Sequence, residues 1–215
     1  MNRQRMMRRK GRSDDIIIYT ISVTPATFDP SWAGNTITVD WGDGTPTEAH
    51  TTGLSHTYAM AGMKKVKFSC ADWTKVTTFD VNTDNCLASI PNFSKLSKLV
   101  NWRAYANQLS GTIPSFAACT ALVDWSASIN QLSGYTAGSF ATQKSLATLH
   151  LYANLLPQAS IDAILADLVT SLGISGRVAC SVNLAGTGNA VPSAAGLADK
   201  ATLAAVSGWV VTTNV

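Results

Sequence analysis

Apolar and polar positions alternate in three segments of the first third of the chain, a pattern typical of β-strands. These segments are IIIYTISV (16–23), NTITVDW (35–41) and KKVKFSC (64–70), and each is rich in β-branched residues. Such residues pack well on a half-buried sheet. Glycine, proline, asparagine and aspartate separate the segments, and the Gly-Asp-Gly sequence after the second one suits a tight turn with positive φ angles. The pattern predicts a β-structured module over residues 15–75.

A longer period governs the chain from residue 76 onward. Four segments follow the pattern L-x-x-L-x-L-x-x-N, with large or small apolar residues at the L positions: 76–84, 99–107, 122–130 and 146–154. Their last residues are 23, 23 and 24 positions apart. A spacing of this kind indicates a solenoid in which each repeat adds one strand to a stacked core.

The repeat pattern assigns roles to particular side chains. Asn107, Asn130 and Asn154 end three of the segments, and we expect their amides to bond to the backbone where the chain turns away. Trp102 and Trp125 stand at inward positions of their segments. We therefore expect both in the core, although exposed tryptophans would also suit stacking on sugars.

Helical spacing replaces the strand pattern after the fourth segment. Apolar residues recur at helical intervals between Pro157 and Leu172, which predicts a helix there with Ser160 as its cap. A second helix is predicted over 193–206, and two further strands over 180–184 and 208–212. We expect these longer units to cover the open end of the solenoid.

Two families carry sequence features similar to these. The stretch Val39–Thr45, the segment His56–Tyr58 and Gly62 resemble, in that order, the turn, the H-x-Y segment and the glycine of PKD-type domains. The repeats resemble bacterial-type leucine-rich repeats. Together the resemblances imply a multi-domain protein with three parts: an extended basic N-terminal arm (1–14), a PKD-like, immunoglobulin-like β-sandwich (15–75) and an α/β leucine-rich-repeat solenoid with a C-terminal helical and strand cap (76–215).

The positive charge of the chain is concentrated in its arm. The formal net charge is +3, yet the first twelve residues carry six basic side chains and no acidic one. The basic residues are Arg3, Arg5, Arg8, Arg9, Lys10 and Arg12. Because a nucleic-acid-binding body would carry basic residues on its folded surface, we do not expect nucleic acid as a partner of the body. The arm itself could bind nucleic acid, an anionic membrane surface or another protein, and we favour the protein.

Neither a membrane anchor nor a catalytic site is predicted. The arm is not followed by the apolar run of a signal peptide, and no window approaches the ~20 apolar residues of a membrane span. The chain has three histidines and a single glutamate, and we recognise no catalytic or cofactor-binding motif. We therefore expect a protein without enzymatic activity, cofactor or metal.

Three further sets of side chains carry groups that could bind a metal or take part in catalysis or disulfide formation. Asp40 and Asp43 could contact a cation, but the loop lacks the further spaced oxygen ligands of a calcium site, so a structural turn is favoured. His56 is interpreted as a structural histidine and not as a catalytic base. The cysteines are widely spaced and are expected to be free, mostly buried thiols: Cys70, Cys86, Cys119 and Cys180.

A binding surface is predicted where strand side chains do not point inward, on the concave face of the solenoid. These columns are polar and contain two tyrosines, which suits contact with polar protein or glycan surfaces. The candidate partner-binding residues are Arg103, Tyr105, Asp124, Ser126, Ser128, His150, Tyr152 and Asn183. Ordinary solvated strand residues would give the same columns, so both interpretations stay open.

These features together favour a protein of a bacteriophage particle. PKD-type and leucine-rich modules in bacteria are generally displayed on surfaces after secretion, whereas a virion protein is made in the host cytoplasm. The order of arm, sandwich and repeats resembles phage decoration or fibre proteins. This resemblance implies that the arm binds other virion proteins and that the repeats bind host surface protein or glycan. A bacterial cell-surface adhesin and a cytoplasmic protein-binding scaffold are the alternatives.

Overall fold

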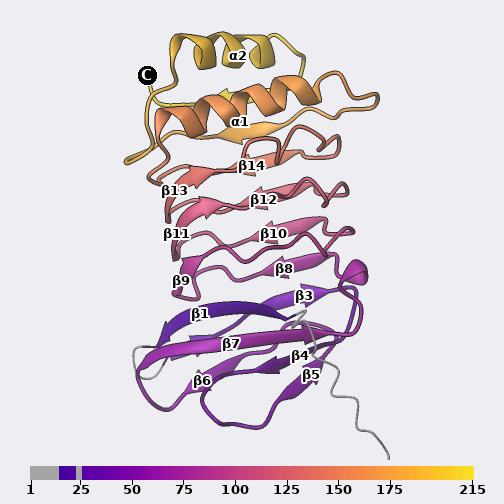
Figure 1. The fold of residues 1–215 in the computed structure, drawn as a ribbon, viewed down its shortest axis with the longest axis vertical. Coiled ribbons are helices and arrows are strands. Elements are labelled where there is room, and N and C mark those ends of the chain that lie inside the picture. Colours follow the sequence, from indigo (N-terminus) through magenta and orange to yellow (C-terminus); the bar gives the residue numbers. More distant parts are fainter. Residues whose placement is uncertain (1–14, 23–25) are drawn as a thin grey trace, which may run out of the picture.

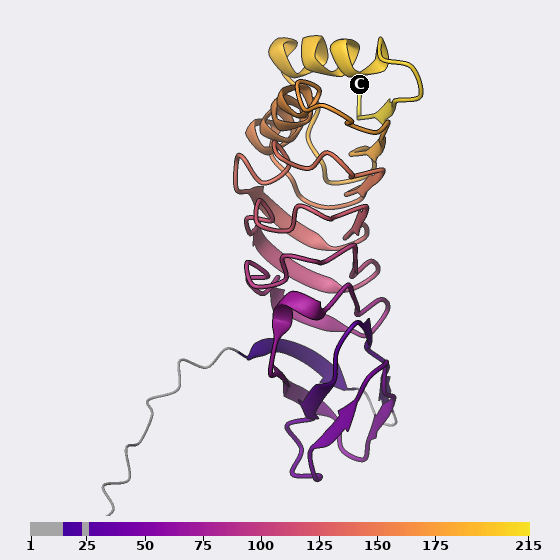
Figure 2. The same cartoon turned by 90° about the vertical axis from the view of Figure 1, so that its right-hand side faces the viewer.

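The computed structural model describes residues 15–22 and 26–215, which form a straight column of stacked β-strands closed at one end by two helices (Figures 1 and 2). Within these residues the chain is mostly β-sheet and stacks in the manner of a β-solenoid. The predicted combination of a β-sandwich with an α/β leucine-rich-repeat solenoid is therefore wrong. Both large sheets instead contain strands from the first 75 residues as well as from the repeats.

One sheet takes a short strand from each repeat, in the order β16-β15-β14-β12-β10-β8-β3. The repeat strands are parallel and in register, so that Trp102 lies beside Phe79 on one side and Trp125 on the other. The strands are β8 (Thr78–Asp80), β10 (Asn101–Arg103), β12 (Asp124–Ser126), β14 (Thr148–His150), β15 (Ser181–Asn183), β16 (Val210–Thr212) and the antiparallel β3 (Ser31–Ala33). The repeat strands lie where the apolar pattern predicted them.

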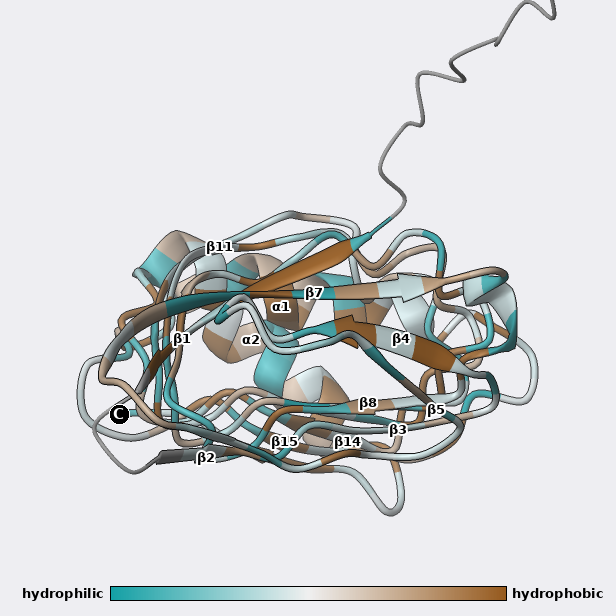
Figure 3. Ribbon diagram, turned by 90° about the horizontal axis from the view of Figure 1, so that it is seen from below, coloured by the Kyte–Doolittle hydropathy of each residue, from teal (hydrophilic) through white to brown (hydrophobic). Residues whose placement is uncertain are grey.

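The opposite wall of the column is a sheet in the order β13-β11-β9-β1-β7-β4-β5. Its strands are β13 (Gln131–Tyr135), β11 (Gln108–Ile113), β9 (Cys86–Ser89), β1 (Ile16–Ser22), β7 (Gly62–Cys70), β4 (Ile37–Asp40) and β5 (Glu48–His50). A small antiparallel pair joins β2 (Ala26–Phe28) to β6 (His56–Tyr58). Seen along the column, β1, β7 and β4 lie on one side and β8, β14 and β15 on the other (Figure 3).

The N-terminal strands continue the column instead of forming a sandwich of their own. Strand β3 pairs with β8 in one wall, and β1 pairs with β9 in the other. The buried apolar side chains of the described residues accordingly form a single cluster, which extends from Ile16 to Trp209. The described residues before position 76 therefore cover the first repeat by direct strand pairing.

Each early repeat builds a second strand where a leucine-rich repeat would place a helix. Strand β11 ends at Ile113, and Pro114 follows. Proline lacks an amide hydrogen and disfavours helical backbone in the residue before it. The chain then returns through two tight turns, in which the amides of Cys119 and Leu122 donate to the carbonyls of Phe116 and Cys119, 2.8 and 3.0 Å away. Strand and turns together use the length of the repeat, which leaves no room for a helix.

The predicted asparagine ladder is confirmed. The Nδ2 of Asn130 donates to the carbonyls of Ala104 and Ala127 at 2.8 and 3.1 Å, and its Oδ1 accepts from the amide of Leu109 at 2.9 Å. Asn107 and Asn154 make the equivalent bonds one repeat away. Asn189 continues the ladder, although the longer spacing of the last repeats hid it in the sequence.

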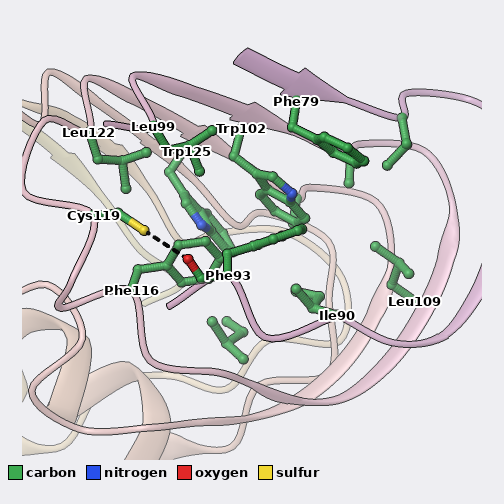
Figure 4. Close-up of a cluster of buried hydrophobic side chains, with 14 of the residues drawn as sticks. Phe79, Ile90, Phe93, Leu99, Trp102, Leu109, Phe116, Cys119, Leu122 and Trp125 are labelled. Carbon is green, nitrogen blue, oxygen red and sulfur yellow. Dashed lines mark hydrogen bonds between the residues drawn. The ribbon is translucent and has the colours of Figure 1, made fainter. Parts of the chain in front are cut away.

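Stacked aromatic side chains fill the interior, as the inward positions of the tryptophans predicted. Trp102 and Trp125 are 1% and 0% exposed, and their ring centroids lie 4.8 Å apart. Phe93 and Phe116 pack against them from the turns of the repeats (Figure 4). All four cysteines are free, and all except Cys70 are buried.

Two helices close the C-terminal end of the column (Figure 1). They are α1 (Gln158–Ser171) and α2 (Ala194–Ala204), close to the predicted ranges. Ser160 is buried within α1 and does not cap it; Pro157 holds the cap position without a side-chain bond. Ser193 caps α2 by accepting from the amide of Gly196. A short 3-10 helix, η1 (Trp73–Lys75), leads into the first repeat.

The glycine-rich turn after β4 is organised by its own side chains. Tyr58 is buried and donates from its hydroxyl to the carbonyl of Trp41 at 3.1 Å. His56 stacks on Trp41 and contacts Asp43 at 2.8 Å. The other oxygen of Asp43 accepts from the amide and hydroxyl of Thr45. Burial raises the pKa of Asp43, but the bonds from Thr45 and the contact with His56 outweigh it and lower the pKa to about 2. These contacts give His56 and Asp43 a structural role.

Candidate functional site

The columns of polar side chains lie on the outer face of the parallel sheet. Register places Arg103, Ser126 and His150 side by side on adjacent strands, with Asn183 next in the row. The face belongs to a straight column (Figure 2), so it lacks the overall curvature expected of a leucine-rich repeat. The surface is nevertheless hollowed locally.

A hollow of about 320 Å³ opens on this face between β10 and β14. It brings together seven of the eight predicted binding residues; the structure does not place Asn183 in its lining. The lining residues are Arg103, Tyr105, Asp124, Ser126, Ser128, Thr148, His150 and Tyr152. Thr148 was not among the candidates, although its place beside Asp124 in register was readable from the repeat alignment.

Backbone hydrogen bonds between repeats continue beyond the strands and align Tyr105, Ser128 and Tyr152. The amide of Ala106 donates to the carbonyl of Ser128 at 2.9 Å, and that of Ile129 to the carbonyl of Tyr152 at 2.9 Å. Tyr105, Ser128 and Tyr152 therefore occupy equivalent positions on three successive repeats. The serine in the middle leaves a gap between the two tyrosines.

The two tyrosines and the serines differ sharply in exposure. Tyr105 is 39% exposed, and Tyr152 is partly exposed with its ring 6.4 Å from that of His150. Ser126 and Ser128 are buried. The hollow therefore has a hydroxyl-bearing floor and aromatic side chains at its rim.

An arginine between two carboxylates dominates the charge of the hollow. The Nε and Nη2 of Arg103 contact Oδ2 of Asp124 at 2.8 and 2.6 Å, and its Nη1 lies 3.7 Å from Oδ2 of Asp80. Burial raises the pKa of Asp80 to about 6, although Arg103 opposes the shift. Since two carboxylates face one guanidinium, this cluster carries no excess positive charge when both are ionised.

Within residues 15–22 and 26–215, no cluster of three or more His, Cys, Asp or Glu side chains is suited to a metal ion. Neither helix of this part of the chain combines the length and apolar character that crossing a bilayer requires. The arm residues Arg3, Arg5, Arg8, Arg9, Lys10 and Arg12 lie outside the described residues.

No protein-family model matches the chain, and no curated protein matches its sequence. Its function is therefore inferred from the chemistry of its own residues.

Proposed function

We propose that the protein is a non-enzymatic structural protein of a bacteriophage particle, of the decoration or fibre type, that binds host surface protein or glycan through the hollow on β10, β12 and β14. The observation that carries the binding proposal is the convergence of seven polar and aromatic candidates on one hollow. Pockets that bind small groups combine aromatic walls with a few well-placed polar groups. This hollow has both.

The exposed tyrosines support a binding role over a purely structural one. Tyrosine offers a large contact area at low entropic cost and is enriched at binding surfaces. Tyr58 and Tyr135 are tied to other groups by their hydroxyls, to Trp41 and Asp167 respectively. No hydrogen bond from the hydroxyl of Tyr105 or Tyr152 is found among the described residues.

The stacked repeats also hold the hollow in a fixed shape. Its residues come from adjacent strands in register, above a packed aromatic core. Side chains on such a scaffold lose little freedom on binding, and this lowers the cost of association. A rigid column is also a suitable spacer between a particle and the cell it meets.

The arm supplies the proposed attachment to other virion proteins. Six basic residues within twelve positions suit an acidic surface of an assembly partner, and terminal segments often order on such partners. Synthesis in the host cytoplasm and location on the virion follow from this proposal. A bacterial cell-surface adhesin or a protein-binding scaffold is the alternative.

Removal of both exposed tyrosines tests the binding proposal. We expect Tyr105→Ala/Tyr152→Ala to weaken binding of the fluorescently labelled protein to whole bacterial cells by about 10- to 100-fold, as for aromatic hot spots. Binding is measured by flow cytometry over a panel of bacteria, with the thermal midpoint of each variant as a folding check. Tyr19→Ala, on β1 in the opposite wall, is the matched control and should bind like the wild type. Equal binding by the double variant would contradict the proposal.

A further inference from the structure

The chemistry of the hollow discriminates between classes of ligand. No side chain in its lining is aliphatic, whereas a pocket for a protein ligand normally receives an apolar anchor. The floor offers hydroxyl groups, which both donate and accept hydrogen bonds. Hydroxyl-rich surroundings with aromatic walls match a ligand that has hydroxyls at its edge and C–H groups on its faces.

The charge balance excludes a site built for anions. Arg103 is already paired with Asp124 and lies near Asp80. A phosphate or carboxylate would have to displace one carboxylate and approach the other. An uncharged ligand avoids this repulsion, because its hydroxyls can accept from the guanidinium while they donate to a carboxylate.

The arginine–aspartate pair is also arranged to hold two neighbouring hydroxyls. Both contacts to Asp124 engage its Oδ2, which leaves Oδ1 to accept from a ligand. Arg103 has five N–H groups, and those not directed at Asp124 can donate to a second hydroxyl. Such a pair of donor and acceptor recognises adjacent hydroxyls on one sugar ring.

The spacing of the tyrosines fits one ring. Adjacent strands of a sheet are ~4.8 Å apart, which puts the backbones of Tyr105 and Tyr152, two strands apart, roughly 9–10 Å from each other. Atoms in contact lie about 3.5–4.0 Å apart, so a single sugar ring fits between the two side chains. The small Ser128 lies between them in the lining of the hollow.

We infer that the hollow is a subsite for an uncharged sugar residue of a surface polysaccharide, held between Tyr105 and Tyr152 with two adjacent hydroxyls on Arg103 and Asp124. This inference rests on the proposed function and narrows its ligand from protein or glycan to glycan. The volume of the hollow, about 320 Å³, limits the subsite to a short stretch of the polysaccharide, and neighbouring sugars extend over the adjacent strands.

Chemical treatment of the binding surface tests this assignment. The probes are isolated envelopes from the bacteria that bind the labelled protein, either untreated, digested with protease or oxidised with periodate. Periodate cleaves the bond between adjacent hydroxyl-bearing carbons and so destroys the feature proposed to be recognised. We expect periodate to lower binding at least tenfold and protease to leave it within twofold.

Two double variants and one single variant test the tyrosine rings and the carboxylate of the site separately. Tyr105→Phe/Tyr152→Phe retains the aromatic faces and should bind within a fewfold of the wild type, whereas the alanine pair should lose binding. Asp124→Asn retains shape but weakens acceptance from a hydroxyl, and should reduce binding of untreated envelopes about tenfold. Tyr19→Ala again serves as the control.

The outcomes distinguish this inference from the proposed function. Binding that is sensitive to protease, resistant to periodate and lost in the alanine pair would overturn the sugar assignment while supporting a host-binding hollow. Binding to no envelope in the panel, or binding unchanged in the alanine pair, would overturn both. Periodate-sensitive binding that requires the tyrosines would support both.

Discussion

Replacing Asp84 with asparagine is expected to raise the free energy of unfolding at pH 8 by about 2–4 kcal/mol. Asp84 holds the ladder position of the first repeat, where the next repeats carry asparagine. It is 5% exposed; its Oδ1 accepts from the amide of Asp29 at 2.9 Å, but its Oδ2 has no hydrogen-bond partner among the described residues. Burial accordingly raises the pKa of Asp84 to about 7. An asparagine would place an amide donor where this oxygen lies.

The free energy of unfolding of the wild type should fall as the pH rises from 4 to 8. The unfolded pKa of an aspartate is about 3.9, so the folded state binds the proton more tightly than the unfolded state. The contribution of protonated Asp84 to the free energy of unfolding is fully present below about pH 4 and is lost as the pH rises through about 7. Asp80, whose pKa is raised to about 6, acts in the same direction. Asp84→Asn should therefore remove more than half of the decline in stability between pH 4 and pH 8.

Urea unfolding of the wild type and Asp84→Asn at pH 4, 5, 6, 7 and 8 measures this effect. Asp199→Asn makes the same chemical change on the partly exposed surface of α2 and is the matched control. It should follow the wild type within about 0.5 kcal/mol, as surface substitutions usually do. A wild type whose stability is constant over this pH range would contradict the account of Asp84 as a buried carboxylate that is costly to ionise.

Removing an asparagine from the middle of the ladder should be strongly destabilising. Asn130→Ala removes the bonds to the carbonyls of Ala104 and Ala127 and to the amide of Leu109. Buried polar groups left without partners cost about 1–3 kcal/mol each, so we expect a total loss of about 3–5 kcal/mol.

The urea midpoint at pH 7 measures this loss. Asn101→Ala, at the start of β10 in the parallel sheet, removes an amide whose hydrogen bond to the Thr78 hydroxyl is a long one of 3.4 Å, and should cost less than 1 kcal/mol. If Asn130→Ala were as stable as Asn101→Ala, the ladder would not be what holds successive repeats together.

The sequence predicted the repeat strands and their inner and outer faces because these depend on local periodicity. One strand and its asparagine turn recur at a constant interval, and this fixes Trp102 and Trp125 inside and Tyr105 and Tyr152 outside. The helices were equally readable from their apolar spacing, apart from the cap, where Pro157 displaced the expected Ser160.

The fold class was predicted wrongly because the nine-residue pattern describes only one wall of the column. The remainder of each repeat decides between helix and strand. Gln108–Ile113 carries a usable signal, because it overlaps the recurrent Asn-Gln-Leu-Ser-Gly sequence and is followed by Pro114, and glycine and proline both disfavour a helix. The pairing of β1 with β9 and of β3 with β8 joins segments more than forty positions apart, and no local pattern reports such contacts.

The repeat pattern placed the candidate residues in columns on one face, and seven of them line one hollow, but the local shape of that hollow could not be read from the sequence. The hollow depends on the small Ser128 between two tyrosines and on the way Arg103 folds against Asp124. Side-chain placement of this kind follows from packing. Asp80 lies beside Arg103 on the neighbouring strand, and their 3.7 Å contact is likewise a matter of side-chain placement.

The most direct test of the virion proposal is density-gradient sedimentation of lysates from cells that produce the protein, comparing the full chain with a version lacking residues 1–14. We predict that the full chain sediments with virus-sized particles and that the shortened chain remains with small soluble proteins. Recovery of both forms as small soluble species, or of the full chain with the cell envelope, would contradict a virion protein and favour a scaffold or an adhesin, respectively.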